Sequence, residues 1–248
     1  MKVTLFDFTG NGCPDPARHA ANCLVFTKST RLNMTPSLML EIAEKSEEEI
    51  LQELKIMSNT NPGSWEFVHL SFIVEGVTRG FTHQLVRTRQ ASYAQQTMRV
   101  LKMQKWKYET GPTIKGNIDR EVIYDYVMRT IDTGYQELIE QGAAIEDARG
   151  ILPTNIRTNI CMSINMRNFI NLTRKRVSIR VQNEYRQVMD AMVMEIEKIY
   201  PWFYIFYKND EIKARKDLQN MIYENKNLSP EEKTEMIKKL DILGGQEL

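Results

Sequence analysis

Apolar and polar residues alternate along some stretches of the chain and recur at helical spacing along others. Alternation predicts strands, and spacings of three and four residues predict helices with one buried face. Strands are predicted at 3–8, 65–76 and 156–164. Helices are predicted at 14–26, 46–57, 77–87, 119–141, 165–176 and 180–200, with a short helical turn at 145–153 and a charged helical region over about the last forty residues. This order of elements predicts an α+β fold, a modest sheet largely surrounded by helices.

Local signals support two of these helices. Ser46 precedes three glutamates and an apolar face formed by Ile50, Leu51, Leu54 and Met57, which is typical of a capped amphipathic helix. In "VTRGFTHQLVR", Phe81 lies four residues before Leu85, and arginine, histidine and arginine follow each other at the same spacing. We therefore expect one apolar face and one polar face on that helix.

Composition narrows the class of protein. The 33 basic residues nearly balance the 32 acidic ones, so bulk charge indicates neither a nucleic-acid-binding nor a membrane-binding protein. Cys13, Cys23 and Cys161 form no C-x-x-C pair, and the three histidines lack metal-ligand spacing, so we expect no disulfide framework and no metal. The polar start of the chain does not resemble a signal peptide, and a cytoplasmic protein is expected.

The segment "RTRQASYAQQTMR" at 87–99 places three arginines around small hydroxyl and amide side chains. Further basic clusters lie at Arg149 and at Arg167, Arg174 and Arg176. Arginine suits two-pronged recognition of a phosphate or of the polar edge of a planar ring. A single helical arginine is more often solvated or ion-paired, but these clusters stand beside amides rather than acids. The residues alone predict binding of an anionic, planar ligand.

Four sequence motifs give more specific information about the family of the chain. "EGVTRGFTHQLVRTRQASYAQQTMR" resembles the signature segment of the flavin-dependent thymidylate synthases (ThyX), and "EDARGILP", "NMRNFINLTRKR" and "RVQNEYR" resemble three later motifs of that family. Their order and spacing agree across about 65–186, roughly half of the chain. The resemblance implies a small, mostly antiparallel sheet surrounded by helices, with a catalytic domain at 1–204 and a charged helical extension at 205–248.

The resemblance also implies an activity. Enzymes of this family transfer a one-carbon unit from methylenetetrahydrofolate to C5 of dUMP, with FAD as the hydride donor, which NADPH reduces. The expected partners are therefore a pyrimidine deoxynucleotide monophosphate and folate, and the expected assembly is a homotetramer with sites formed between subunits. Neither a membrane nor nucleic acid is expected as a partner.

Site residues are carried over position by position from the resemblance. Residues matching nucleotide contacts are Gln84, Arg87, Gln95, Gln96, Thr97, Met98, Arg99, Arg149 and Arg176. Residues matching flavin contacts are Glu66, Arg87, Thr88, Arg89, Gln95, Asn165, Arg167 and Asn171. Arg176 matches the catalytic arginine that polarises the N3 edge of uracil.

The chain departs from the family pattern mainly at histidines. Thr88 replaces the central histidine of Arg-His-Arg, and Asn61, Phe67 and Arg180 also stand where histidines are found. Thr97 replaces a serine and keeps its hydroxyl, and Gly63 replaces a hydroxyl residue. Because the missing histidines mostly face flavin or folate, two alternatives stay open. One is a non-reductive pyrimidine C5 hydroxymethylase of the same family, and the other is a non-catalytic relative that binds nucleotides or nucleic acid.

Overall fold

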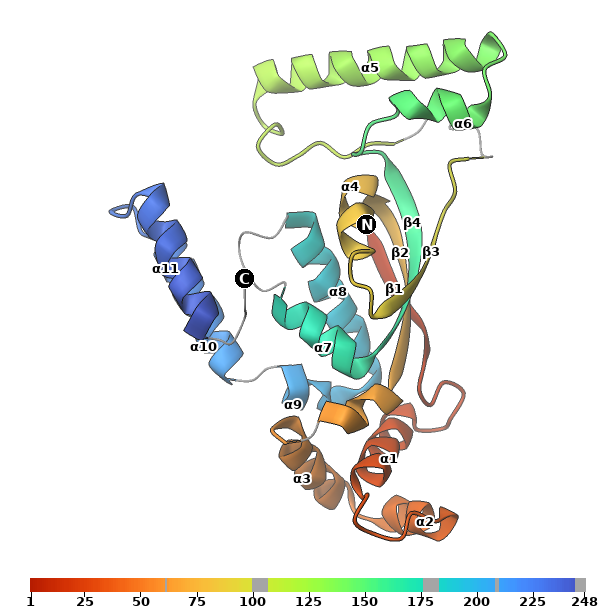
Figure 1. Cartoon of the computed structure of the whole chain (residues 1–248), viewed down its shortest axis with the longest axis vertical. Helices are drawn as coiled ribbons and strands as arrows, with labels where there is room; N and C mark the ends of the chain where they lie inside the picture. Colours follow the sequence, from red (N-terminus) through yellow and green to blue (C-terminus); the bar gives the residue numbers. More distant parts are fainter. Residues whose placement is uncertain (61, 100–106, 176–182, 208–209, 244–248) are drawn as a thin grey trace. The chain divides into compact units, whose positions relative to one another are not determined.

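The computed structural model describes residues 1–60, 62–99, 107–175, 183–207 and 210–243 (Figure 1). Four strands form one antiparallel sheet in the order β1-β2-β4-β3. The strands are β1 (Lys2–Phe8), β2 (His69–Thr78), β3 (Ala91–Gln95) and β4 (Arg157–Asn165). The predicted α+β fold is confirmed.

Helices make up most of the remaining described residues. The α-helices are α1 (Pro16–Lys28), α2 (Pro36–Glu44), α3 (Glu47–Ser58), α4 (Arg79–Leu85), α5 (Ile118–Glu140), α6 (Ile145–Ala148), α7 (Met166–Lys175), α8 (Asn183–Ile199), α9 (Tyr204–Tyr207), α10 (Asp210–Glu224) and α11 (Pro230–Leu243). Three short 3-10 helices are η1 (Pro62–Phe67), η2 (Arg149–Ile151) and η3 (Pro201–Phe203). No helix of the described segments is long and apolar enough to cross a lipid bilayer.

The structure differs from the predicted strand at 65–76 in its first residues. Pro62 begins the 3-10 helix η1, which buries Trp65 and leaves Phe67 exposed, and the strand starts only at His69. The strand then runs to Thr78, whose hydroxyl accepts a hydrogen bond from the Phe81 amide at 3.0 Å. A side-chain cap of this kind begins a helix. The helix expected from residue 77 therefore starts at Arg79.

Two elements were not expected from the sequence. Helix α2 follows Thr35 and has Pro36 at its first position, where proline is well tolerated. Strand β3, "ASYAQ", carries no buried residue, so it lacks the apolar alternation that marks a strand. It forms because it pairs with β4 at the edge of the sheet.

The chain divides into two compact units. Unit 1 consists of residues 1–2, 73–89 and 93–162, and contains α4, α5, α6 and η2. Unit 2 consists of residues 3–72, 90–92 and 163–248, and contains the other helices.

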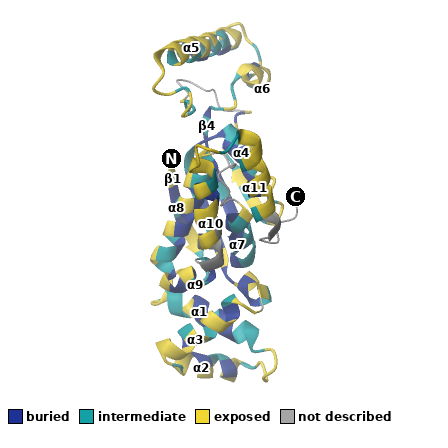
Figure 2. Cartoon of the chain, turned by 90° about the vertical axis from the view of Figure 1, so that its left-hand side faces the viewer, coloured by how far each residue is buried: buried dark blue, intermediate teal, exposed yellow. Residues whose placement is uncertain are grey.

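Aromatic and aliphatic side chains form the core of unit 2. Phe72 of β2 stacks on Phe169 of α7 at a centroid distance of 5.6 Å, and Trp65 meets Phe206 edge-on at 5.1 Å. Met189 and Met192 of α8 are buried in this core, whereas Met194 of the same helix is exposed. Figure 2 shows the dark blue buried residues on α1, α7 and α8.

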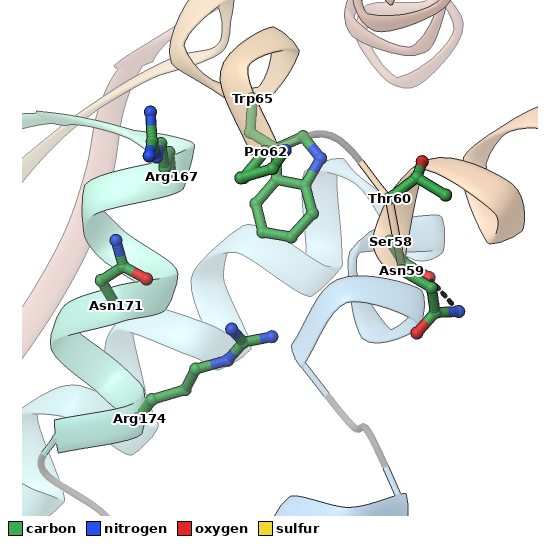
Figure 3. A pocket seen from close by; sticks show the side chains of 8 residues that line it. All are labelled: Ser58, Asn59, Thr60, Pro62, Trp65, Arg167, Asn171 and Arg174. Carbon is green, nitrogen blue, oxygen red and sulfur yellow. Dashed lines mark hydrogen bonds between the residues drawn. The ribbon is translucent and has the colours of Figure 1, made fainter. Parts of the chain in front are cut away.

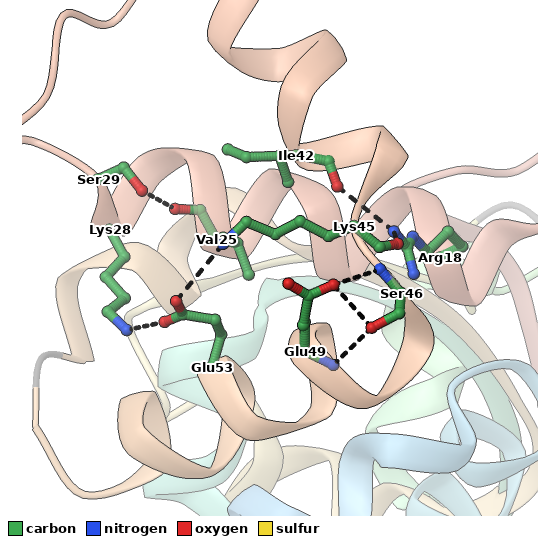
Figure 4. Close-up of polar contacts among 9 residues, drawn as sticks. All are labelled: Arg18, Val25, Lys28, Ser29, Ile42, Lys45, Ser46, Glu49 and Glu53. Atoms are coloured by element: carbon green, nitrogen blue, oxygen red, sulfur yellow. Dashed lines mark hydrogen bonds and ion pairs between the residues drawn. The ribbon is translucent and has the colours of Figure 1, made fainter.

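Polar contacts connect the first three helices of unit 2 (Figure 4). Arg18 of α1 donates to the carbonyl oxygens of Ile42 and Ala43 in α2, at 3.3 and 3.2 Å. Lys28 of α1 forms an ion pair with Glu53 of α3. In the predicted capped helix, Ser46 and Glu49 bond reciprocally to each other's backbone, which confirms the sequence signal.

Candidate functional site

The segment that follows β3 is held in unit 1 by three hydrogen bonds. The amide of Gln95 donates through Nε2 to Oγ1 of Thr82 on α4, at 2.8 Å. The backbone N–H of Gln96 donates to the carbonyl of Asn159 on β4, at 3.0 Å, and Arg79 donates through Nη2 to the carbonyl of Gln96, also at 3.0 Å. Two of the expected nucleotide residues are therefore fixed between α4 and β4.

Two of the expected nucleotide arginines meet at one glutamate. Arg99 Nε lies 2.8 Å from Glu146 Oε2, and both side chains are largely exposed. Arg149 donates through Nε to the backbone carbonyl of Glu146, at 3.2 Å. Thr97 accepts a hydrogen bond from the Arg99 amide at 3.1 Å. Residues about fifty positions apart in the sequence thus converge around α6.

The Arg-Thr-Arg segment follows α4 directly. Arg87 and Arg89 are exposed, and within the described segments neither forms an ion pair. The hydroxyl of Tyr93 lies 2.9 Å from the carbonyl of Leu85 and 3.0 Å from that of Thr88. Tyr93 therefore ties β3 to the end of α4, and it leaves the two guanidinium groups open to solvent.

The other expected nucleotide residues differ in their surroundings. Gln84 is half-buried on α4, and Met98 is buried. Arg176, the expected catalytic residue, lies outside the described residues, as do Asn61 and Arg180.

Positive charge is concentrated near Arg79. Burial of its guanidinium, and next the charge of Arg149, lower the pKa of Arg79 from its ordinary value. A positive charge that is partly removed from water is costly unless an anion approaches it. The electrostatics of this region therefore favour an anionic ligand.

Half of the expected flavin residues lie in unit 2, namely Glu66, Asn165, Arg167 and Asn171, and the other half lie in unit 1. Arg167 of α7 forms an ion pair with Glu66 of η1. The side-chain oxygen of Asn165 accepts from the Asn168 amide at 2.9 Å, so it caps the start of α7 and leaves its own amide NH2 group to donate elsewhere. Asn171 follows Arg167 by one helical turn and faces the same side.

A cavity of about 340 Å³ opens beside these residues. Figure 3 shows Arg167, Asn171 and Arg174 along α7 on one side and the end of α3 on the other, with Trp65 between them. The full lining consists of Ser58, Asn59, Thr60, Pro62, Trp65, Arg167, Asn171 and Arg174. The cavity is thus lined by guanidinium, amide and hydroxyl groups and by the side chain of Trp65.

Trp65 has an unusual environment in this cavity. It is only 4% exposed, yet its indole Nε1 has no hydrogen-bond partner within the described residues. A buried N–H group without an acceptor costs about 1–3 kcal/mol. A ligand that brings an acceptor atom into the cavity would remove that cost.

The sequence did not indicate Arg79, Thr82, Glu146 or Trp65 as site residues. Arg79 had the spacing of a polar helix stripe, and Trp65 had the alternation of a strand, so both patterns indicated structural positions. No group of histidine, cysteine, aspartate and glutamate side chains in the described part of the chain could hold a metal ion.

The chain is similar to known proteins along most of its length. The family described as "Thymidylate synthase complementing protein" matches residues 14–202. The flavin-dependent thymidylate synthase of Clostridium tetani is 32% identical over 222 residues, which cover 81% of this chain and 84% of the relative. The enzyme of the same name from Geobacter sulfurreducens is 30% identical over 205 residues, with the same coverage of both chains. The chain therefore belongs to the family of flavin-dependent thymidylate synthases.

Proposed function

We propose that this protein is a flavin-dependent thymidylate synthase that transfers a one-carbon unit from methylenetetrahydrofolate to C5 of dUMP. The observation that carries the proposal is the network around the segment after β3. It fixes Gln95 and Gln96 by hydrogen bonds and brings Arg99 and Arg149 to Glu146. The fixed side-chain amide of Gln95, the fixed backbone of Gln96 and the converging guanidinium groups suit a pyrimidine ring and its phosphate.

The residues of unit 2 fit a flavin. FAD carries phosphate oxygens and a ring edge with carbonyl and nitrogen acceptors, and the cavity presents donors for both. Arg167, Asn171 and the orphaned indole N–H of Trp65 are the donors that would hold it. Glu66 would keep Arg167 in place through their ion pair. When bound and reduced by NADPH, FAD supplies the hydride of the reaction.

The chain's own residues bind and orient the nucleotide. Exposed guanidinium groups at Arg87, Arg99 and Arg149 would hold the phosphate, and Glu146 would release Arg99 as the phosphate arrives. Thr82 orients the Gln95 amide toward the ring. Arg176, carried over from the family, would polarise the N3 edge of the pyrimidine. All of these residues belong to the catalytic domain at 1–204, so the charged helical extension at 205–248 takes no part in the proposed reaction.

We also propose that the chain assembles as a homotetramer. Helix α5 buries Met128 and Tyr135, and many of its other residues are exposed, drawn in yellow in Figure 2. Its exposed apolar residues include Ile118, Val122, Ile123, Tyr126 and Val127. Exposed apolar surface of this kind is typical of a contact between chains. Light scattering is expected to give four times the 29.0 kDa mass of one chain, and a monomer that still binds nucleotide would contradict the assembly.

Product mass is the decisive test of the activity. The purified protein is loaded with FAD and given dUMP, methylenetetrahydrofolate and NADPH, and the nucleotide is analysed by mass spectrometry. A methylated nucleotide is the expected product. A hydroxymethylated product, heavier by one oxygen, would indicate the non-reductive alternative, and nucleotide binding without turnover would indicate a non-catalytic relative. Arg99→Ala is expected to lose turnover, whereas Arg120→Ala, at an exposed arginine of α5, is expected to keep it.

A further inference from the structure

Helix α4 ends at Leu85, and the expected flavin residues Arg87, Thr88 and Arg89 follow it closely. The N–H of Arg87 donates to the carbonyl of Gln84 at 3.3 Å, and that of Thr88 to the carbonyl of Leu85 at 3.0 Å. Carbonyl oxygens at the end of a helix carry partial negative charge and repel an anion unless a donor covers them. Two exposed arginines therefore follow a backbone turn that by itself disfavours an anionic ligand.

The hydroxyl of Tyr93 covers these carbonyl oxygens. It lies 2.9 Å from the oxygen of Leu85 and 3.0 Å from that of Thr88. A phenol has one proton to donate, so the two oxygens share it. Leu85 is fully buried and Tyr93 is half-buried, so water has little access to the contact. Tyr93 thus fixes the end of α4 from strand β3.

This contact determines where two guanidinium groups start from the backbone. Arg87 and Arg89 stand on either side of Thr88, whose carbonyl Tyr93 holds. Both arginines are exposed, and neither forms an ion pair within the described segments. A fixed backbone reduces the conformational freedom that these side chains lose when they bind a ligand. The hydroxyl therefore favours an anion in two ways, because it covers the carbonyl oxygens and holds the turn.

We infer that Tyr93 is a positioning residue for the flavin cofactor, whose hydroxyl holds Arg87 and Arg89 in place for the diphosphate of FAD. The inference rests on the proposed function and adds a residue that acts through its neighbours without touching the ligand. A diphosphate is favoured over a phosphate monoester because it offers one phosphate to each of the two guanidinium groups.

Tyr93→Phe tests the hydroxyl, because it removes one oxygen and keeps the ring. FAD and dUMP are titrated calorimetrically into full-length protein from which flavin has been removed. We expect the variant to bind FAD about three- to tenfold more weakly, as for the loss of one hydrogen bond, and to bind dUMP with a smaller loss. At saturating FAD its turnover is expected to equal that of wild type, because a positioning residue takes no part in the chemistry.

Two comparisons separate positioning from a general structural effect. The matched control, Tyr124→Phe, removes another half-buried hydroxyl of unit 1, which donates to the carbonyl of Glu109 at 3.2 Å. It is expected to leave FAD affinity unchanged. In an Arg89→Gln background, Tyr93→Phe is expected to weaken FAD binding less than it does in wild type, because one arginine through which the hydroxyl acts is gone.

Three results would overturn the inference while the proposed function stands. These are additive losses in Tyr93→Phe and Arg89→Gln, equal losses of FAD affinity in the two tyrosine variants, and a larger loss for dUMP than for FAD. Loss of the folded circular dichroism spectrum in Tyr93→Phe would also overturn it, because the hydroxyl would then be structural. If the wild-type protein binds no FAD, the proposed function fails and the inference falls with it.

Discussion

Replacing Trp65 by phenylalanine tests whether the cavity of unit 2 is a flavin site. The exchange removes the indole N–H, which has no described partner in the ligand-free chain, and keeps an aromatic ring against Phe206. Trp202 provides a matched comparison, because it is equally buried, at 6% against 4% exposure. Its indole N–H, in contrast, donates to the carbonyl of Ala17 at 2.9 Å.

The two substitutions share the packing cost of a smaller ring, so their difference reports the hydrogen bonding. Trp202→Phe breaks a hydrogen bond with a net contribution of about 0.5–1.5 kcal/mol. Trp65→Phe instead removes an unpaired donor whose burial costs about 1–3 kcal/mol. We therefore expect Trp65→Phe to be the less destabilising exchange by about 2 kcal/mol, or about 4–8 °C in melting temperature.

For FAD affinity we expect the opposite order, with the larger loss in Trp65→Phe. If flavin accepts the Trp65 N–H, Trp65→Phe loses one hydrogen bond and weakens FAD about two- to tenfold, whereas Trp202→Phe leaves the affinity unchanged. Quenching of tryptophan fluorescence by FAD should also fall in Trp65→Phe alone. Thermal unfolding without ligand and fluorescence titration with FAD measure the two effects. Equal losses of stability, or unchanged FAD affinity and quenching in Trp65→Phe, would refute the reasoning.

Three further substitutions test other parts of the chain. Glu146→Gln frees Arg99 from an exposed ion pair that contributes at most about 1 kcal/mol. In calorimetric titration, dUMP should therefore bind up to about fivefold more tightly to this variant. Weaker binding would mean that the ion pair orients Arg99 for the nucleotide. The hydrogen bond from Lys28 lowers the pKa of the Glu53 carboxyl in the folded chain. The ionised carboxylate therefore stabilises the fold at pH values above its unfolded pKa of about 4.3. This stabilisation is lost as the pH falls through the lower pKa of the folded state. Glu53→Gln should therefore reduce the acid-side loss of stability in urea unfolding at several pH values, and an unchanged pH profile would contradict the pair. Thr88→His restores the ring that the family has at this position and should tighten FAD binding while the product stays methylated; unchanged affinity would remove position 88 from the flavin site.

The sequence alone determined the elements whose signals are local. The helix after Ser46 carries its own cap and an apolar face, of which Ile50, Leu54 and Met57 are buried as predicted and Leu51 is only half-buried. In β4, alternating residues of "RTNICMSIN" are buried, as the alternation required. Such signals persist in the fold because neighbouring residues along one element supply them.

Tertiary structure decided the elements and contacts that depend on distant partners. The polar strand β3 exists because β4 pairs with it, and η1 replaces the first residues of a predicted strand because Pro62 starts a tight turn that buries Trp65. Motif spacing indicated Gln95, Arg99 and Arg149 as site residues, but it did not indicate the hydrogen bonds and the ion pair that fix their positions.

The supporting contacts of the candidate site come from across the fold. Arg79 has the spacing of a solvated helix stripe, yet β2 and β4 place its guanidinium on the Gln96 carbonyl, seventeen positions away in the chain. Trp65 has the pattern of a core residue, and only the packing of η1 against α7 shows that its side chain lines a cavity and that its N–H group is buried without a described acceptor. The hydrogen-bond partners of these two residues depend on which distant segments meet, so local sequence patterns carry no information on them.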